Sequence, residues 1–323
     1  METADSGVVR AGLAEIWPRA AQIGQWLARS LQKRVDRRAQ RQCHAQWVLL
    51  CGPCDEQARA CPEPVALGVI EPPPDRFWAD PFLHTQDGRT CIFFEELPFA
   101  SGRGHISALE VDQLGRPIAD AKAVIQADHH LSYPFLFEFG GDLYMAPESC
   151  GARRLDLYRC RNFPFDWVYE RTLMNGQAVV DATLFEHEKR WWVLCSMRAG
   201  QMRPNNSLCA FYGESPLGDR WQAHPLNPLV QSFATARPAG ALFRDTRNRL
   251  LRPSQNCVPR YGFGLNLSEV VEFTTETYRE RLVWQTTGPR AGGWRALHHM
   301  HWCDGLMVMD AQRLIAKPDV VSA

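Results

Sequence analysis

The sequence predicts an all-β fold, a five-bladed β-propeller that follows an N-terminal α-helical extension. The main observation is a hairpin pattern, in which two apolar runs flank a turn rich in Gly or charged residues. The pattern occurs at residues 78–96, 132–149, 180–196, 237–256 and 296–311. These repeats are roughly 50–60 residues apart, close to the length of a four-stranded blade with loop insertions. A second observation is the content of 45% hydrophobic residues, which is ample for a large core.

Residues 1–45 differ from the rest and are expected to form the helical extension. Their apolar residues follow the 3.6-residue period of an amphipathic helix. Between residues 29 and 41, basic side chains face one acid, Asp36. Such a helix is suited to an anionic membrane surface or a partner protein, reached through residues 10–41. The alternative is a solvated helix packed against the side of the propeller.

Residues 46–64 are expected to be a linker, and they contain a Cys-x-x-Cys pair, Cys51 and Cys54. Two thiolates at this spacing can contribute to a zinc site or exchange a disulfide. A structural zinc takes four ligands, however, and the nearest candidates for the others are Cys43, His44 and Cys61. We therefore assign neither a metal nor a cofactor to the chain.

Residues 65–323 are expected to form the propeller, with a strand near 65–70 that completes the last blade and closes the ring. The first strand of each blade lines the axis, so the residues that open the repeats are expected to meet there. These residues are Asp80, Tyr133, Asp181, Arg237 and His298. Because none is a usual core residue, they predict a polar axial site, although each taken singly fits a turn or a strand cap equally well.

Charge and composition limit the classes of function that the chain can have. The formal net charge is +0 and the pI about 7.1, which gives no reason to expect nucleic acid binding. We find no run of 18 apolar residues and no secretory leader, and the eleven cysteines favour a reducing compartment. The expectation is a cytoplasmic protein, peripheral to a membrane if the basic helix binds one.

Several runs resemble the N-terminal domain of plant glucosamine inositolphosphorylceramide transferases and their bacterial relatives. They are FWADPF (77–82), FFEE (93–96), GHIS (104–107), HHLSYPF (129–135), APES (146–149), VDATLF (180–185), ARPAG (236–240), RPSQNC (252–257) and YG (261–262). The resemblance covers about residues 70–310. That family is similar to the five-bladed propellers of arabinanase, xylosidase and invertase-type glycosidases. The plant proteins carry a separate glycosyltransferase domain after this one, for which this chain has no room.

The resemblance implies catalytic roles for three carboxylates. Asp80 corresponds to the base or nucleophile of the related glycosidases, and Asp181 to an aspartate that orients the substrate and tunes a pKa. Glu148 is the candidate acid, with Glu96 as a substitute. In the fourth repeat, where the acid is expected, the sequence has Arg237 and Gln255. This departure weighs against hydrolysis, which uses two carboxylates across the scissile bond.

The remaining candidates are assigned to substrate binding. Arg237 and Arg252 are suited to the phosphate of a nucleotide sugar or lipid, or to an acidic sugar; alternatively they neutralise the axial acids. His130 and His298 can exchange protons near neutral pH. The aromatic rings of Trp78, Tyr133 and Tyr261 can stack on a sugar, or else belong to the blade core.

The sequence therefore predicts a carbohydrate-active propeller with a sugar or glycolipid substrate. The preferred function is a glycosyltransferase-type enzyme of glycan or glycolipid assembly, or its substrate-binding part, acting with a nucleotide sugar or a phosphate-bearing acceptor. One alternative is a glycoside hydrolase that uses Asp80, Asp181 and a glutamate acid. The other is a non-catalytic glycan-binding module.

Overall fold

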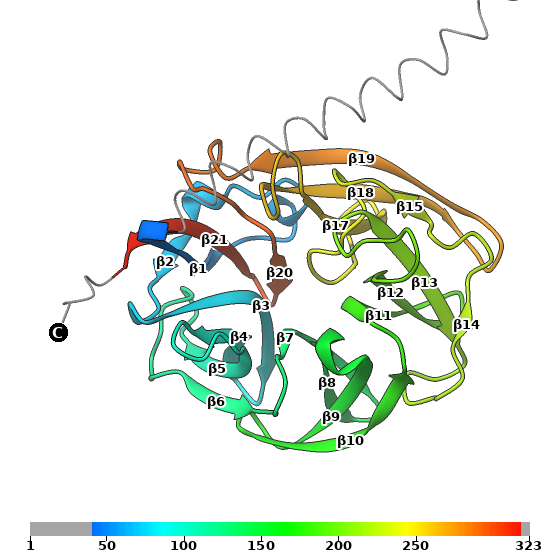
Figure 1. The fold of residues 1–323 in the computed structure, drawn as a ribbon, viewed down its shortest axis with the longest axis horizontal. Helices are drawn as coiled ribbons and strands as arrows, with labels where there is room; N and C mark the ends of the chain where they lie inside the picture. The colour runs from blue at the N-terminus through cyan, green and yellow to red at the C-terminus, as the bar shows by residue number, and fades with distance from the viewer. Residues whose placement is uncertain (1–40, 318–323) are drawn as a thin grey trace, which may run out of the picture.

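The computed structural model describes residues 41–317 of the chain, and these residues form an all-β ring of five sheets around one axis (Figure 1). The prediction of a five-bladed β-propeller is confirmed. The predicted helical extension falls on residues that, apart from 41–45, lie outside the described part. No helix within residues 41–317 is long and apolar enough to cross a membrane.

The first three blades follow the chain in order, each with its earliest strand innermost. The first blade contains β3 (Arg76–Gln86), β4 (Arg89–Pro98), β5 (His105–Val111) and β6 (Lys122–Ile125). The second contains β7 (Ser132–Phe139), β8 (Asp142–Ser149), β9 (Arg154–Asn162) and β10 (Asp166–Asn175). The third contains β11 (Val179–His187), β12 (Arg190–Met197), β13 (Ser207–Gly213) and β14 (Gln222–Ala223), and β15 (Val230–Gln231) also pairs with β13.

The fourth blade has a short inner strand. It contains β16 (Phe243–Arg244), β17 (Leu250–Asn256), β18 (Gly264–Phe273) and β19 (Tyr278–Thr287). Before β16 the chain runs inward without regular pairing, apart from a bridge between Pro238 and Ser254. The weak pairing follows from the run of Pro238, Ala239 and Gly240, which has one residue without an amide proton and one without a side chain.

The fifth blade joins the two ends of the described chain. It contains β20 (Met300–Cys303), β21 (Leu306–Ala316), β1 (Cys43–Pro53) and β2 (Gly68–Ile70). Strand β1 pairs with β21 along its whole length, from Cys43 opposite Ala316 to Pro53 opposite Leu306. This pairing closes the ring by joining the two ends of the described chain in one sheet. The closing strand predicted near residues 65–70 is present as β2, which pairs with β1.

The propeller begins before residue 65, where the sequence predicted its start, because β1 belongs to the last blade. Residues 46–64, expected to be a linker, contain most of this strand and two short 3₁₀ helices, Ala58–Ala60 and Pro64–Ala66. The physical reason is the apolar run from Trp47 to Cys51, which is buried and packs between β2 and β21. The propeller therefore includes residues from Cys43 onward.

Hydrophobic side chains fill the contacts between neighbouring blades. One cluster joins the second and third blades through Phe135, Leu157, Leu184 and Val193, and another joins the first and fifth through Leu49, Ile92 and Val308. All eleven cysteines are free. Cys51 belongs to the second of these clusters, and burial raises the pKa of its thiol to about 12.

Candidate functional site

The axial residues are placed by an irregularity that the first three inner strands share. Asp80, Tyr133 and Asp181 have positive φ angles of 52°, 44° and 52°. At each of them the pairing with the next strand shifts register, as in a β-bulge. Non-Gly residues in this region cost about 1–3 kcal/mol each, so the surrounding sheets must hold them there. Bulges of this kind redirect a side chain, and here three successive blades turn a polar group toward the axis.

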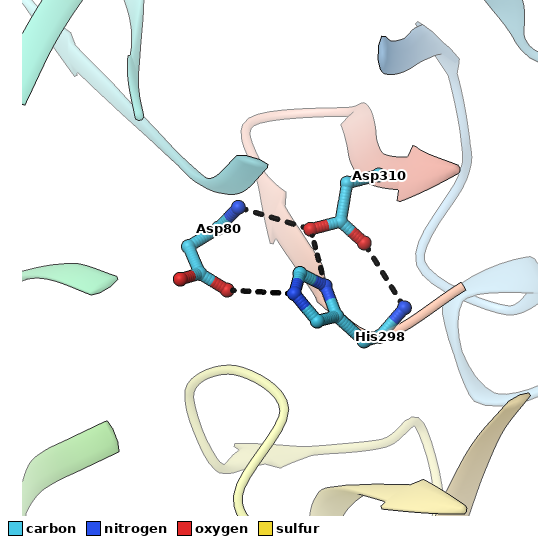
Figure 2. Close-up of side chains that lie close together, drawn as sticks. All are labelled: Asp80, His298 and Asp310. Carbon is cyan, nitrogen blue, oxygen red and sulfur yellow. Dashed lines mark hydrogen bonds and ion pairs between the residues drawn. The ribbon is translucent and has the colours of Figure 1, made fainter. Parts of the chain in front are cut away.

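A first cluster joins Asp80 to His298 and Asp310, which comes from β21 (Figure 2). The Asp310 carboxylate accepts hydrogen bonds from the backbone N–H groups of Asp80, His298 and His299, at 2.9, 3.0 and 2.9 Å. His298 Nδ1 lies 2.6 Å from Asp310 Oδ2, and His298 Nε2 lies 3.7 Å from Asp80 Oδ1. Asp310 thus joins the fifth blade to the first and sets the imidazole between two carboxylates.

Protonation in this cluster is shifted by burial and by the neighbouring charges. Burial raises the pKa of Asp80 to about 8; His298 opposes this shift, and the carboxylates of Asp181, Glu95 and Asp310 add to it. Burial alone would lower the pKa of His298, but the Asp310 and Asp80 carboxylates outweigh it and raise that pKa. Burial and the neighbouring charges therefore favour the protonated form of Asp80 and the cationic form of His298 near neutral pH.

The ligand atoms of Asp80, His298 and Asp310 also lie within 4.8 Å of one another, close enough to surround a cation. Among residues 41–317, this is the one cluster of Asp, Glu, His and Cys groups with such geometry. Both oxygens of Asp310 already accept backbone hydrogen bonds. We therefore interpret the cluster as a network of hydrogen bonds and ion pairs that joins the first and fifth blades.

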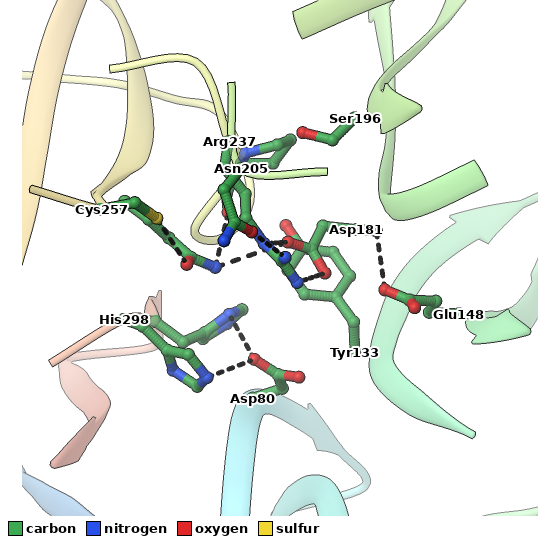
Figure 3. Close-up of polar contacts among 12 residues, drawn as sticks. Asp80, Tyr133, Glu148, Asp181, Ser196, Asn205, Arg237, Cys257 and His298 are labelled. Carbon is green, nitrogen blue, oxygen red and sulfur yellow. Dashed lines mark hydrogen bonds and ion pairs between the residues drawn. The ribbon is translucent and has the colours of Figure 1, made fainter. Parts of the chain in front are cut away.

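A second cluster joins Asp181 to Arg237 (Figure 3). Arg237 Nε and Nη2 donate to the two Asp181 oxygens at 2.6 and 3.2 Å, and Nη1 donates to Asn205 Oδ1 at 2.7 Å. Gln255 Nε2 lies 3.4 Å from Asp181 Oδ2. The guanidinium also stacks 4.9 Å from the centre of the Tyr261 ring, which is 37% exposed. The Asp181 charge is thus neutralised, and an accessible aromatic ring covers the pair.

Glu148 lies beside this pair at the end of β8. Its Oε2 accepts a hydrogen bond from the Asp181 backbone N–H at 3.2 Å. Desolvation and the neighbouring Asp181 carboxylate raise the pKa of Glu148 well above its usual range, although Arg237 acts in the opposite direction. A half-buried carboxyl group that holds its proton can act as an acid or donate a hydrogen bond.

Tyr133 occupies the axis itself and is fully buried. Its hydroxyl is 2.8 Å from Thr183 Oγ1 and accepts a hydrogen bond from the Gly240 N–H at 3.0 Å. Gly240 is required here, because a Cβ at this position would lie 2.0 Å from the Met300 carbonyl oxygen. Tyr133 thereby ties the second, third and fourth blades together, so its role is structural rather than sugar stacking.

Glu95 and Glu96, near the end of β4, have different partners. Glu95 contacts His130 Nε2 at 3.1 Å and contributes to the electrostatic field at Asp80. Glu96 instead pairs with Arg76 and accepts a hydrogen bond from Ser107 at 2.7 Å. Successive residues of a strand point to opposite faces of the sheet, so the two glutamates meet different partners. Glu95, rather than the predicted Glu96, is the one that acts electrostatically on Asp80, and His130 contacts Glu95.

Two further candidates lie away from the axis. The Arg252 guanidinium is buried and donates two hydrogen bonds of 2.8 Å to Glu280, and another to the Thr235 carbonyl oxygen. Trp78 is 7% exposed and packs on Phe94 in the core between the first and fifth blades. Arg252 therefore forms a structural ion pair within the fourth blade, and Trp78 is a core residue.

The structure brings together Asp80, Tyr133, Asp181, Arg237 and His298, with Glu148, Gln255 and Tyr261 beside them (Figure 3). It adds three residues that the sequence reasoning missed, namely Glu95, Asn205 and Asp310. Asp310 follows the apolar run of the last repeat, and its position in a buried strand was a signal for a functional or paired carboxylate. Asn205 comes from a loop with no repeat equivalent, so it left no comparable signal.

The fold and the axial cluster define a five-bladed β-propeller with a group of buried polar residues at its axis, beside the partly exposed Tyr261. Residues 61–312 match the family described as glucosamine inositolphosphorylceramide transferase 1, N-terminal, and the chain belongs to this family.

Known relatives extend well beyond this domain. Over 248 residues the chain is 31% identical to glucosamine inositolphosphorylceramide transferase 1 of Oryza sativa subsp. japonica, covering 75% of this chain and 32% of that protein. Over 210 residues it is 33% identical to the Arabidopsis thaliana protein of the same name, covering 64% of this chain and 27% of that protein. The chain thus spans about a third of the length of these relatives. Among solved structures, the catalytic domain of a Coprinopsis cinerea GH62 α-L-arabinofuranosidase matches with a TM-score of 0.57 at 12% identity, over 85% of this chain and 98% of that one. This likeness concerns the fold.

Proposed function

We propose that the propeller binds the sugar portion of a glycolipid at its axis and serves glycosyl transfer, either as the enzyme or as its substrate-binding part. The observation that carries the proposal is the bidentate pair of Asp181 and Arg237. Arg237 opens the fourth blade, where the related glycosidases are expected to provide an acid. A guanidinium cannot donate a proton to a leaving group near neutral pH, so the pair favours binding and orientation over hydrolysis.

The surroundings of the pair suit a sugar. Asn205 and Gln255 present amide groups, and Tyr261 offers a partly exposed ring over the guanidinium. Sugar sites in proteins commonly combine such planar polar groups with an aromatic face, because a sugar ring has hydroxyls at its edge and apolar C–H groups on its face. The names of the relatives support a glycolipid substrate, and we extend it to this chain as part of the proposal.

The second candidate is glycoside hydrolysis, and Glu148 favours it. Glu148 retains a proton through its raised pKa and lies beside Asp181, so it can supply the acid. Acid and base roles need two carboxyl groups in different protonation states, and with a pKa of about 8 Asp80 takes the base role once it has lost its proton. In this mechanism Glu148 protonates the leaving oxygen and Asp80 serves as base or nucleophile.

The test compares two variants that each break the ion pair of an arginine that belongs to the fourth blade. Asp181→Asn breaks the axial pair, and Glu280→Gln breaks the pair of Arg252 outside the site. Both should lose stability, but Asp181→Asn should also weaken oligosaccharide or glycolipid binding by about 10–100-fold, the effect of losing a charge-assisted contact. The measurement is calorimetric titration, together with turnover of nucleotide-sugar donors.

The outcomes separate the candidates. Equal sugar binding by the two variants would contradict the proposed site. Turnover of aryl glycosides that Glu148→Gln abolishes would establish hydrolysis instead. Binding at the axis with no turnover of donors or glycosides would assign the chain as a glycan-binding module.

A further inference from the structure

Charged side chains are distributed unequally over the two faces of the propeller. Asp80, Tyr133 and Asp181 lie near the start of inner strands, and the loops at that end of the strands form what we call the site face. Its loops include residues 71–75, 99–104, 126–131, 150–153, 198–206 and 288–299. The hairpin turns at the other end form the opposite face, which includes residues 54–67, 87–88, 112–121, 188–189, 214–221, 245–249 and 274–277.

The site face carries exposed arginines without acidic partners. Arg103, Arg153, Arg198, Arg203 and Arg290 are exposed, and none forms an ion pair with another residue of the described segment 41–317. Arg103 and Arg153 donate only to the backbone carbonyl oxygens of Asp128 and Gly176. These five side chains come from four loops around the axis, with Arg198 and Arg203 in the same loop.

The acids of the site face are already engaged. Glu71 pairs with Arg313, and Asp75 pairs with Arg76. The Asp128 carboxylate lies 2.7 Å from His129 Nδ1. Glu71 and Asp75 therefore each neutralise another arginine, so that Asp128 alone among these acids offsets the charge of the five arginines.

The opposite face carries an excess of acidic residues, although Lys189, Arg190, Arg220 and Arg247 are exposed there as well. Its turns contain Asp87, Glu188, Glu214, Glu276 and Asp304. Several of its arginines pair with an acid of their own loop, namely Arg59 with Glu56, Arg116 with Asp112 and Arg249 with Asp245. A chain of zero formal net charge thus has a cationic face and an anionic one.

We propose that the site face docks on the surface of an anionic lipid membrane, with the axis directed at the headgroups. Each basic residue near such a surface contributes about 1 kcal/mol of attraction, so several arginines on one face can hold and orient the protein. The inference deepens the proposed function, because a glycolipid with a phosphate near its sugar would present an anion beside the axial site. The anionic opposite face would be repelled from the same surface, which fixes the orientation.

The test uses the full chain and sugar-free vesicles, so that docking is measured apart from sugar binding. Vesicles of phosphatidylcholine alone and with phosphatidylglycerol are sedimented with the protein. We expect binding only to the anionic vesicles, weakening as salt screens the charges. The site-face variant Arg198→Gln, Arg203→Gln and Arg290→Gln should bind about 100-fold more weakly, from about 1 kcal/mol per arginine.

Two matched variants remove the same charge elsewhere. Arg190→Gln, Arg220→Gln and Arg247→Gln alter exposed arginines of the opposite face, and this variant should bind like the wild type. Arg29→Gln, Lys33→Gln and Arg34→Gln alter the basic stretch near the N-terminus. Equal loss in the site-face and opposite-face variants, or loss only in the N-terminal variant, would overturn the inference. So would wild-type protein that does not bind anionic vesicles, and none of these results affects the test of sugar binding.

Discussion

At the scale of single residues, the two axial aspartates, Asp181 and Asp80, have different neighbours. Asp181 is matched by a guanidinium with two hydrogen bonds. Asp80 has no arginine and instead lies near two histidines, with His298 Nε2 at 3.7 Å and His299 Nδ1 at 3.9 Å. Burial lowers the pKa of His299 well below its usual range, and the His298 charge adds to this effect, so His299 stays neutral. His298, whose pKa is raised by the Asp310 and Asp80 carboxylates, is therefore the cationic neighbour of Asp80.

The raised pKa of Asp80 predicts a specific dependence of stability on pH. Burial raises this pKa from 3.8 to about 8, so between these values the folded chain holds a proton that the unfolded chain has released. Stability is therefore lost progressively as pH rises through this range. An asparagine has no such proton, so Asp80→Asn should gain stability relative to the wild type as pH rises from 5 to 8. Urea unfolding at a series of pH values measures this difference.

The control is Asp120→Asn, an exposed loop position whose effect on stability should stay constant over the same pH range. A constant difference between wild type and Asp80→Asn would show that Asp80 is ionised throughout. It would also contradict the raised pKa assigned to Asp80.

At the scale of elements, the inner strands carry the axial side chains, and the outer strands of each blade keep the inner strands in position. The bulges at Asp80, Tyr133 and Asp181 each leave a strained residue in place. Neighbouring strands keep their register on both sides of each bulge, which supplies the stabilisation. The fifth blade differs, because two of its strands come from the N-terminal part of the described chain.

Strand β1 should therefore contribute strongly to stability. Leu49 in β1 is fully buried, and Leu314 in the adjacent β21 is 38% exposed. Leu49→Ala should cost about 2–5 kcal/mol, because it removes buried methyl groups and leaves a cavity. Leu314→Ala, the same substitution in the same sheet, should cost about 0.5 kcal/mol. Chemical denaturation measures both, and equal losses would mean that β1 packs more loosely than its burial indicates.

At the scale of the whole molecule, the ring is closed by hydrogen bonds between segments far apart in the chain. The pairing of β1 with β21 joins residues 43–53 to residues 306–316. Asp310 strengthens the same closure, because its carboxylate in the fifth blade accepts the Asp80 N–H of the first. The closing strands and the axial site therefore depend on each other.

Two truncations should separate the extension from the closing strand. A chain that begins at residue 41 keeps β1 and should unfold cooperatively at nearly the melting temperature of the full chain. A chain that begins at residue 55 lacks β1 and exposes the edge of β21, so it should lose the cooperative transition. Differential scanning calorimetry gives both results. A large loss in the first truncation would show that residues 1–40 are part of the folded core.

The sequence by itself determined the architecture, because the hairpin repeat is a local pattern repeated five times. The repeat also predicted that one residue of each blade would lie at the axis, since equivalent positions in equivalent blades meet there. These residues are Asp80, Tyr133, Asp181, Arg237 and His298. Family membership was likewise readable from short runs of residues.

Only the tertiary structure decided the partners of each charge. Arg237 and Arg252 are alike in sequence, yet one pairs with Asp181 at the axis and the other with Glu280 inside the blade. The choice between Glu95 and Glu96, and the place of β1 in the last blade, depended in the same way on strand pairing. Register and long-range pairing set which side chains meet, and a one-residue shift turns each of them to the other face of its sheet.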